Sequence, residues 1–225
     1  MTEKILVIDD SAEVRDLLSV ALKEAGYRVV EADTGPAGIE AYHAHQPDLT
    51  LLDIGLGSMD GLEVCRQLRA VSSAPIIFLT SRSDEVDQLV GFAAGGDDYV
   101  TKPFSPRVVL ARVSSLLRRN SRDDEAKTMF VAGPITVDTA ARVAMLDGTP
   151  VDLTRTEFDL LAALIEHPDR VVTRTALLDR VWGEWYGDTH VVEVHMSRLR
   201  SKFKKAGGPP VGAVVRGVGY KLGVE

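Results

Sequence analysis

The stretch Leu49-Thr50-Leu51-Leu52-Asp53 is a short apolar run that ends abruptly in a carboxylate. The loop-forming residues of segment 55–61 follow it, so the pattern predicts a strand buried on both faces of a parallel sheet. Open α/β sheets bind their ligands at the carboxyl ends of their strands. We therefore expect Asp53 to lie at this edge of a sheet, where its carboxylate is available for chemistry.

Strand-like and helix-like segments alternate five times around this stretch. The apolar runs that predict strands cover residues 4–9, 28–32, 48–53, 75–80 and 98–100. The segments with helical periodicity or capping signals cover residues 14–22, 36–45, 61–70, 84–94 and 106–117. This alternation predicts a doubly wound five-stranded parallel α/β sheet with right-handed crossovers.

The pattern changes after a charged segment at 118–128 that contains almost no apolar residue and predicts a linker. Short strands are expected at 135–138, 142–146 and 150–152, with a hairpin turn at Asp147-Gly148. We therefore assign 1–119 to a first domain, 120–128 to a linker and 129–225 to a second domain.

Three helices and a hairpin complete the second domain. Thr154 and Glu157 form a capping-box pattern at the start of the first helix, Thr173 can cap a second helix that reaches Trp182, and the third covers about 189–205. A glycine-containing hairpin at 214–222 follows. A small sheet, three helices and a hairpin predict an α+β winged helix-turn-helix.

Composition narrows the setting in which the protein works. The 225 residues carry a net charge of -7 and one cysteine, Cys65, so no internal disulfide can form and a reducing environment fits. No run approaches the roughly 18 apolar residues that span a bilayer. We expect a cytoplasmic protein without a membrane segment.

The charge is unevenly distributed, because segment 194–224 holds seven basic residues and no acidic one. A basic segment on an acidic protein predicts a surface for a polyanion such as double-stranded DNA. Arg198 and Arg200 can reach guanine edges, Lys202 suits phosphate, and Arg216 in its hairpin can enter a minor groove. His195 lies near the inner face of its helix, so a buried role and a DNA contact are both open.

Chemistry in the first domain is expected where its strands end. Asp9 ends the first predicted strand and Asp10 follows it, Asp53 ends the third, Thr80 ends the fourth, and Lys102 comes just after the fifth. Three neighbouring carboxylates need a cation, and Mg²⁺ prefers oxygen ligands. A metal ion, an ammonium group and a hydroxyl around one aspartate suit transfer of a phosphoryl group to that aspartate.

With these residues in order, segment 1–119 resembles the flavodoxin-like receiver domain of two-component signalling. The resemblance implies that Asp53 is the phosphoacceptor and that Thr80 and Lys102 contact the phosphoryl oxygens. It implies a magnesium site formed by Asp9, Asp10, Asp53 and the backbone carbonyl of Gly55. It also implies a cis Lys102–Pro103 bond, and a switch in which Tyr99 follows Thr80.

Segment 129–225 resembles the DNA-binding domain of OmpR/PhoB-type response regulators. The matching strings are Leu153-Thr154-Arg155-Thr156-Glu157-Phe158, Val191-Val192-Glu193-Val194-His195, Arg198-Leu199-Arg200 and Val215-Arg216-Gly217-Val218-Gly219-Tyr220. The resemblance implies a recognition helix at 189–205 and an RNA polymerase contact at 183–188. The residues expected to contact DNA are His190, His195, Arg198, Arg200, Lys202, Arg216 and Lys221.

Together these resemblances imply a transcription regulator that accepts a phosphoryl group from a sensor histidine kinase. The family forms a two-fold dimer on phosphorylation, and Asp98 and Arg112 match one of its intersubunit ion pairs. We expect no enzymatic turnover beyond phosphorylation from a phosphohistidine donor and autodephosphorylation.

Two alternatives remain from the residues alone. The first is a DNA-binding regulator whose receiver dimerises without phosphorylation. The second, a magnesium-dependent phosphohydrolase with Asp53 as nucleophile, would need an acid for the leaving group, and position 55 is glycine.

Overall fold

The chain divides into two compact units, Met1–Asn120 and Ser121–Glu225, and each is described by itself. The computed structural model describes residues 2–57, 59–81, 94–117, 128–183 and 190–223. Three predicted segments, the helix at 84–94, the linker at 118–128 and the loop at 183–188, lie outside these residues apart from one terminal residue each.

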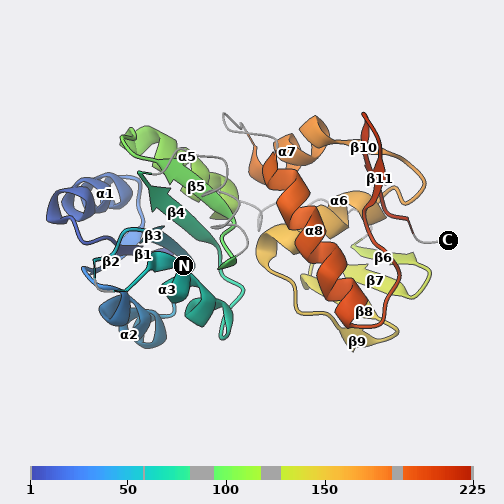
Figure 1. The fold of residues 1–225 in the computed structure, drawn as a ribbon, viewed down its shortest axis with the longest axis horizontal. Helices are drawn as coiled ribbons and strands as arrows, with labels where there is room; N and C mark the ends of the chain where they lie inside the picture. Colours follow the sequence, from blue (N-terminus) through green and yellow to red (C-terminus); the bar gives the residue numbers. More distant parts are fainter. Residues whose placement is uncertain (1, 58, 82–93, 118–127, 184–189, 224–225) are drawn as a thin grey trace. The chain divides into compact units, whose positions relative to one another are not determined.

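The N-terminal unit contains the predicted parallel sheet, whose strands follow the order β2-β1-β3-β4-β5 (Figure 1). The strands are β1 (Lys4–Ile8), β2 (Arg28–Ala32), β3 (Leu49–Asp53), β4 (Ile76–Thr80) and β5 (Asp98–Thr101). The helices are α1 (Ala12–Glu24), α2 (Gly35–His45), α3 (Gly61–Arg69) and α5 (Pro106–Leu117). The predicted fold class of this unit is confirmed.

Successive side chains of each strand point to opposite faces of the sheet and belong to two separate hydrophobic layers. Ile5 and Val7 of β1 join the layer that contains α1 and α5, whereas Leu6 and Ile8 join the layer that contains α2 and α3. Side chains alternate between the faces of a strand, so a strand covered by helices on both faces must be apolar throughout. All five residues of β3, including Thr50 and Asp53, are accordingly buried.

The order of the strands brings the site residues to one edge. β1 pairs in parallel with β3, with Ile8 opposite Leu52, so the residues that follow Ile8 lie beside Asp53. β3 pairs with β4, and β4 with β5, where Thr80 is opposite Thr101. Parallel strands end at a common edge, which therefore carries Asp9, Asp53 and Thr80.

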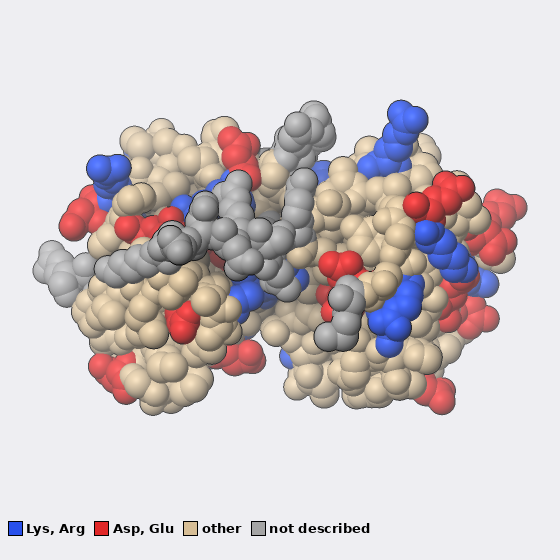
Figure 2. All heavy atoms as spheres, turned by 180° about the vertical axis from the view of Figure 1, so that it is seen from behind, with Lys and Arg blue, Asp and Glu red and all other residues tan. Residues whose placement is uncertain are grey.

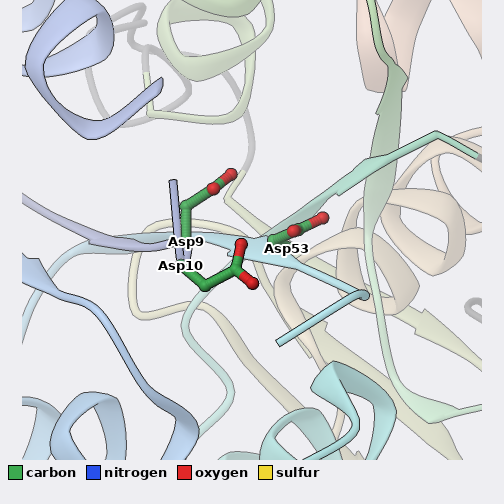
Figure 3. Close-up of side chains that lie close together, drawn as sticks. All are labelled: Asp9, Asp10 and Asp53. Atoms are coloured by element: carbon green, nitrogen blue, oxygen red, sulfur yellow. The ribbon is translucent and has the colours of Figure 1, made fainter. Parts of the chain in front are cut away.

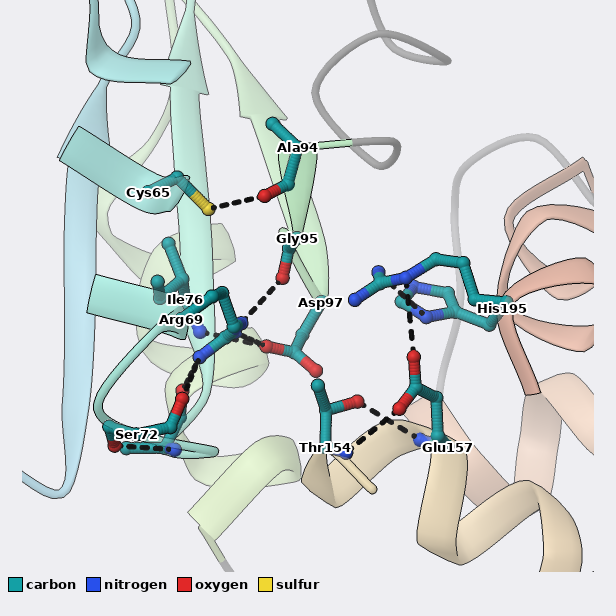
Figure 4. Close-up of polar contacts among 12 residues, drawn as sticks. Cys65, Arg69, Ser72, Ile76, Ala94, Gly95, Asp97, Thr154, Glu157 and His195 are labelled. Carbon is teal, nitrogen blue, oxygen red and sulfur yellow. Dashed lines mark hydrogen bonds and ion pairs between the residues drawn. The ribbon is translucent and has the colours of Figure 1, made fainter. Parts of the chain in front are cut away.

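A buried ion pair fixes the chain before β5. Arg69, at the end of α3, pairs with Asp97 and donates from Nε to the Gly95 carbonyl at 2.8 Å (Figure 4). The Asp97 carboxylate also accepts the backbone N–H of Ile76 at 2.9 Å. One carboxylate thus joins α3, the start of β4 and the residue before β5, which fixes where β5 begins.

The described residues of the C-terminal unit form two small antiparallel sheets and three helices (Figure 1). The sheets are β6-β7-β8-β9 and β10-β12-β11. Their strands are β6 (Met129–Ala132), β7 (Ile135–Asp138), β8 (Val143–Leu146), β9 (Thr149–Pro150), β10 (Val172–Thr173), β11 (Ala213–Val215) and β12 (Gly219–Lys221). The helices are α6 (Arg155–Ile165), α7 (Arg174–Trp182) and α8 (His190–Lys205), as the winged helix-turn-helix pattern predicts.

Two details of the predicted strands are corrected. The strand expected at 150–152 occupies 149–150, because Asp147 and Gly148 form the turn itself with φ angles of 48° and 77°. Positive φ at both central residues defines the two-residue hairpin turn that Asp-Gly favours. β6 and β10 had not been predicted, and β10 is a two-residue strand held only by pairing with β12, which no local periodicity can signal.

Apolar residues on α6, α7 and α8 face one another in the core of this unit. Leu161, Leu177, Val192, Met196 and Phe203 are all fully buried. The predicted capping box of α6 is present, since the Glu157 N–H donates to Thr154 Oγ1 at 3.3 Å and the Thr154 N–H donates to Glu157 Oε2 at 2.8 Å. No helix in the described part of the chain is long and apolar enough to cross a membrane.

Position 61 must be glycine because the backbones make a close contact there. Replacing Gly61 therefore tests the packing beneath Asp53. A Cβ at Gly61 would lie 2.1 Å from the Asp53 carbonyl oxygen, so Gly61→Ala must displace one of the two segments. We expect it to lower the free energy of unfolding by about 1–3 kcal/mol in urea denaturation followed by circular dichroism. Gly55→Ala is the matched control, because its Cβ would meet nothing nearer than Asp53 Oδ2 at 3.7 Å. Equal stability of the two variants would contradict the prediction.

Candidate functional site

Three carboxylates converge at the carboxyl edge of the parallel sheet (Figure 3). Asp9 and Asp10 follow β1, Asp53 ends β3, and one oxygen of each lies within 4.8 Å of the others. Asp9 and Asp53 are buried, whereas Asp10 is exposed and opens the cluster to solvent. The structure thus brings together the acidic residues that the sequence had placed at separate strand ends.

Lys102 supplies a positive charge to this cluster from the end of β5. Its Nζ lies 2.8 Å from Asp9 Oδ2 and 3.1 Å from Asp53 Oδ2. The backbone fixes the start of this side chain, because the Lys102 N–H donates to the Thr80 carbonyl at 2.6 Å. The Lys102–Pro103 peptide bond is cis, as the resemblance implied.

The charges in the cluster shift one another's protonation. Burial raises the pKa of Asp53, and the neighbouring charge of Asp9 raises it further, while attraction to Lys102 opposes both. Burial alone would lower the pKa of Lys102, but its hydrogen bond to Asp9 and the charges of Asp53 and Asp9 outweigh that cost and raise it. Lys102 is therefore a fixed cation beside the Asp53 carboxylate.

The donor set fits a hard divalent cation. One ammonium group cannot neutralise three carboxylates, and Mg²⁺ takes carboxylate and carbonyl oxygens while keeping several waters. The loop after β3 approaches the same place, since a Cβ at Gly57 would lie 4.0 Å from Asp10 Oδ2. The Gly55 carbonyl accepts the Gly57 N–H at 3.1 Å, which leaves its second lone pair for another partner.

The two expected switch residues lie on the neighbouring strands. Thr80 is buried at the end of β4, beside Thr101 of β5. Tyr99 of β5 is half-buried, pairs in register with Phe78 and packs against the hydrophobic layer of α2 and α3. Thr80 lies at the acidic edge, and Tyr99 lies on the neighbouring strand β5, so a movement at the edge can pass from one residue to the other.

The basic segment of the second unit runs along α8 and into the β11–β12 hairpin. Arg216 is exposed between Val214 and Val218, whose exposed fractions are 51% and 48%. Arg200 donates to the Gly212 carbonyl at 3.0 Å, which ties α8 to this hairpin. Figure 2, drawn from behind, shows Lys and Arg side chains interspersed with Asp and Glu side chains on the visible surface.

The other expected DNA contacts occupy different environments. His190 is exposed at the start of α8, with Nδ1 3.2 Å from Glu193 Oε2, and Lys221 Nζ lies 3.9 Å from Asp169 Oδ1. His195 is fully buried, and its ring centroid is 5.5 Å from that of Trp182. A direct DNA contact by His195 is therefore corrected to a buried role, because α8 turns this side chain inward.

Glu157 is a site residue that sequence reasoning had assigned only to a helix cap. Its side chain is fully buried, with Oε1 3.2 Å from Arg198 Nε and Oε2 2.7 Å from Lys202 Nζ. Arg198 and Lys202 are four residues apart on α8 and so share a face, which is the only signal that the sequence offered. Their common partner, on another helix, had to come from the tertiary structure.

The expected dimer residues are paired within the chain. Arg112 Nη1 of α5 lies 2.9 Å from Asp98 Oδ2 and 3.2 Å from Asp98 Oδ1, and both side chains are largely buried. Burial raises the pKa of Asp98 to about 6 although the charge of Arg112 opposes the shift. An intersubunit pair from these residues would have to replace this contact.

The fold and the site define a class of protein, in which a receiver-type α/β unit precedes a winged-helix unit with a basic helix and hairpin. Two family models match accordingly. Residues 5–114 match "Response regulator receiver domain", and residues 148–222 match "Transcriptional regulatory protein, C terminal".

Similar proteins cover nearly the whole chain. RegX3, a sensory transduction protein of Mycolicibacterium smegmatis, is 41% identical over 97% of this chain and 98% of its own length. The DNA-binding response regulator MtrA of Mycobacterium tuberculosis is 43% identical over 99% of this chain and 98% of its own. The structure of DrrB, described as a Thermotoga maritima OmpR/PhoB homologue, is 33% identical with a TM-score of 0.52, and covers 99% of both chains.

The chain therefore belongs to the OmpR/PhoB family of two-component response regulators. It is a DNA-binding regulator with a receiver domain and a transcription regulatory domain, and regulation by phosphorylation is the standard mechanism of its family. Response regulators interact with histidine kinases and with DNA.

Burial of Asp98 predicts a measurable pH dependence. Because its pKa in the folded chain is about 6 rather than 3.8, the folded state binds this proton more tightly than the unfolded state. The stabilisation is complete below about pH 4 and is lost as the pH rises through about 6, an effect on the order of 3 kcal/mol. Urea denaturation across this range checks it. Asp98→Asn should lack this component, and an identical pH profile in the two proteins would contradict the prediction.

Proposed function

We propose that Asp53 is the phosphoacceptor through which a sensor histidine kinase controls DNA binding by this regulator. The observation that carries the proposal is the convergence of three carboxylates and Lys102 at one edge of the sheet. In the transfer, an Asp53 carboxylate oxygen forms a bond to phosphorus while the P–N bond of the donor phosphohistidine breaks. The electron pair of that bond returns to the imidazole.

Asp9, Asp10, Asp53 and the Gly55 carbonyl would hold Mg²⁺. When bound, the ion would offset negative charge on the carboxylates and on the phosphoryl group. Asp10 is the exposed member of the set, so it offers an entry for the ion from solvent. Asp9 is already paired with Lys102, which limits its share of the metal's charge.

Lys102 and Thr80 would stabilise the transferred group. Lys102 Nζ is 3.1 Å from an Asp53 oxygen, so a phosphoryl group on Asp53 would lie within reach of the ammonium group. Thr80 ends the neighbouring strand β4, which suits a hydroxyl donor to a second oxygen. Positioning and charge stabilisation account for most of the catalysis in phosphoryl transfer.

Removal of the acceptor tests this function and separates its alternatives. Asp53→Asn should abolish labelling by a small-molecule phosphodonor in the presence of Mg²⁺, and chelation of Mg²⁺ should abolish labelling of the unsubstituted protein. The exposed residue Asp16 provides the control, because Asp16→Asn has the same change in charge and should be labelled normally. The labelled protein should bind its operator more tightly than the unlabelled one.

The outcomes of that experiment distinguish three functions. Operator affinity that is unchanged by the phosphodonor would favour a receiver that dimerises without phosphorylation. Sustained release of phosphate from an added phosphomonoester, lost in Asp53→Asn, would favour a phosphohydrolase. We expect only phosphorylation and slow autodephosphorylation, because Gly55 provides no side chain to protonate a leaving group.

Exposed and half-buried residues of α8 and the β11–β12 hairpin would contact the DNA. We propose His190, Arg198, Arg200, Lys202, Arg216 and Lys221 as contacts. Arg216 has two exposed valines beside it, which suits insertion of a basic and apolar tip into a minor groove. Helix α8 would lie in the major groove, where a 16-residue helix can present several basic side chains.

Phosphorylation of the N-terminal unit would control DNA binding by the C-terminal unit through dimerisation, and the dimer face would contain β5 and α5. Phosphorylation of Asp53 would move Thr80 and Tyr99, and β5 carries both Tyr99 and Asp98. Exchange of the internal Asp98–Arg112 pair for the equivalent pair between two chains would form a two-fold dimer. The segment at 183–188, largely outside the described residues, would contact RNA polymerase, and the cytoplasm would be the place of action because the DNA lies there.

This coupling predicts an association state that depends on phosphorylation. The unphosphorylated protein should sediment as a monomer, because Asp98 and Arg112 are satisfied within the chain. Addition of Mg²⁺ and a phosphate mimic should produce a weak dimer, and Asp53→Asn should show no response. A tight dimer without the mimic in analytical ultracentrifugation would contradict the prediction.

A further inference from the structure

Glu157 is a fully buried carboxylate that contacts two proposed DNA-binding residues of α8, Arg198 and Lys202. No other fully buried carboxylate among the described residues contacts two of these. Glu157 Oε1 forms an ion pair with Arg198 Nε at 3.2 Å, and Oε2 lies 2.7 Å from Lys202 Nζ. Oε2 also accepts the Thr154 N–H at 2.8 Å (Figure 4). Two cations of α8 and one backbone N–H therefore converge on one side chain.

The charge on this carboxylate is secured by its partners. Burial alone would raise the pKa of Glu157, but the charges of Arg198 and Lys202, the Lys202 hydrogen bond and the Thr154 N–H together lower it. Arg198 and Lys202 keep exposed fractions of 19% and 32% in their side chains, whereas that of Glu157 is zero. The anion is inside and its two cations extend to the surface.

We infer that Glu157 is a positioning residue for DNA binding: it fixes the directions of Arg198 and Lys202 and neutralises part of their charge before DNA arrives. This inference rests on the DNA contacts proposed above. Arg198 Nε is ion-paired with Glu157 at 3.2 Å, and Arg198 Nη1 lies 3.5 Å from His195 Nδ1, so the guanidinium contacts the protein at two of its nitrogens. A restrained guanidinium loses less conformational entropy when it meets a base edge or a phosphate.

The buried anion also changes how the protein binds DNA of any sequence. Each cation that neutralises a phosphate releases counterions. In a plot of log affinity against log salt concentration, each such contact makes the downward slope steeper by about 0.9. A cation already paired with Glu157 adds less to that slope than a solvated one. Lys204 is exposed on α8 four residues after Arg200, so it shares a face with a proposed DNA contact and would reach backbone phosphate. Lys204 is therefore the matched comparison for Lys202.

A double-mutant cycle on the full chain tests the inference with a mixed-sequence DNA duplex. In the otherwise unsubstituted protein, Lys204→Gln should reduce the salt slope by about 0.9, and Lys202→Gln should reduce it by less than half as much. Glu157→Gln keeps an acceptor for the Thr154 N–H but removes the charge. In that background, Lys202→Gln should reduce the slope by about 0.9, as Lys204→Gln does.

The control for charge alone is Asp152→Asn, at an exposed position that precedes α6. It should leave the effect of Lys202→Gln small. Equal effects of Lys202→Gln and Lys204→Gln in the otherwise unsubstituted protein would overturn the role of Glu157 while DNA binding itself stands. That comparison decides the question even if Glu157→Gln fails to fold. A duplex affinity that does not depend on salt in the unsubstituted protein would instead overturn the proposed DNA contacts, and this inference with them.

Discussion

The interaction on which the N-terminal unit depends is the balance of charge between Lys102 and the carboxylates of Asp9 and Asp53. Three carboxylates within 4.8 Å of one another repel, and burial of two of them adds a cost in desolvation. The ammonium group of Lys102 contacts both buried members and offsets part of that cost. The excess negative charge that remains suits a divalent cation, and such a cation would also be needed to offset the charge of the proposed phosphoryl group on Asp53.

The sheet is built so that these groups can meet. β1 and β3 are neighbours, which places Asp9 beside Asp53, while β5 lies beyond β4, so Lys102 must reach across the end of β4. The Lys102 N–H to Thr80 carbonyl hydrogen bond fixes the origin of that reach. The two hydrophobic layers hold all five strands rigidly, and the polar edge can carry uncompensated charge because it is supported by an apolar core.

The C-terminal unit uses the opposite arrangement, in which one buried anion serves two cations. A buried carboxylate without partners costs several kcal/mol, and Glu157 avoids that cost through Arg198, Lys202 and the Thr154 N–H. An apolar residue could fill the same space, so the retained charge points to a role in orientation rather than in stability alone. In both units a buried carboxylate determines where a lysine lies.

The sequence by itself determined the order and type of most elements, because apolar runs, helical periodicity and capping residues such as Thr154 act over a few neighbouring positions. It also determined that Asp9, Asp10, Asp53, Thr80 and Lys102 lie at or just after the ends of strands. It could not signal β10, whose two residues form a strand only by pairing with β12. Only the tertiary structure decided that Glu157 would hold two cations of α8, that Asp98 would pair with Arg112, and that His195 would be buried. Each of these contacts depends on how one helix or strand packs against another. Neighbouring residues in the sequence do not specify that packing.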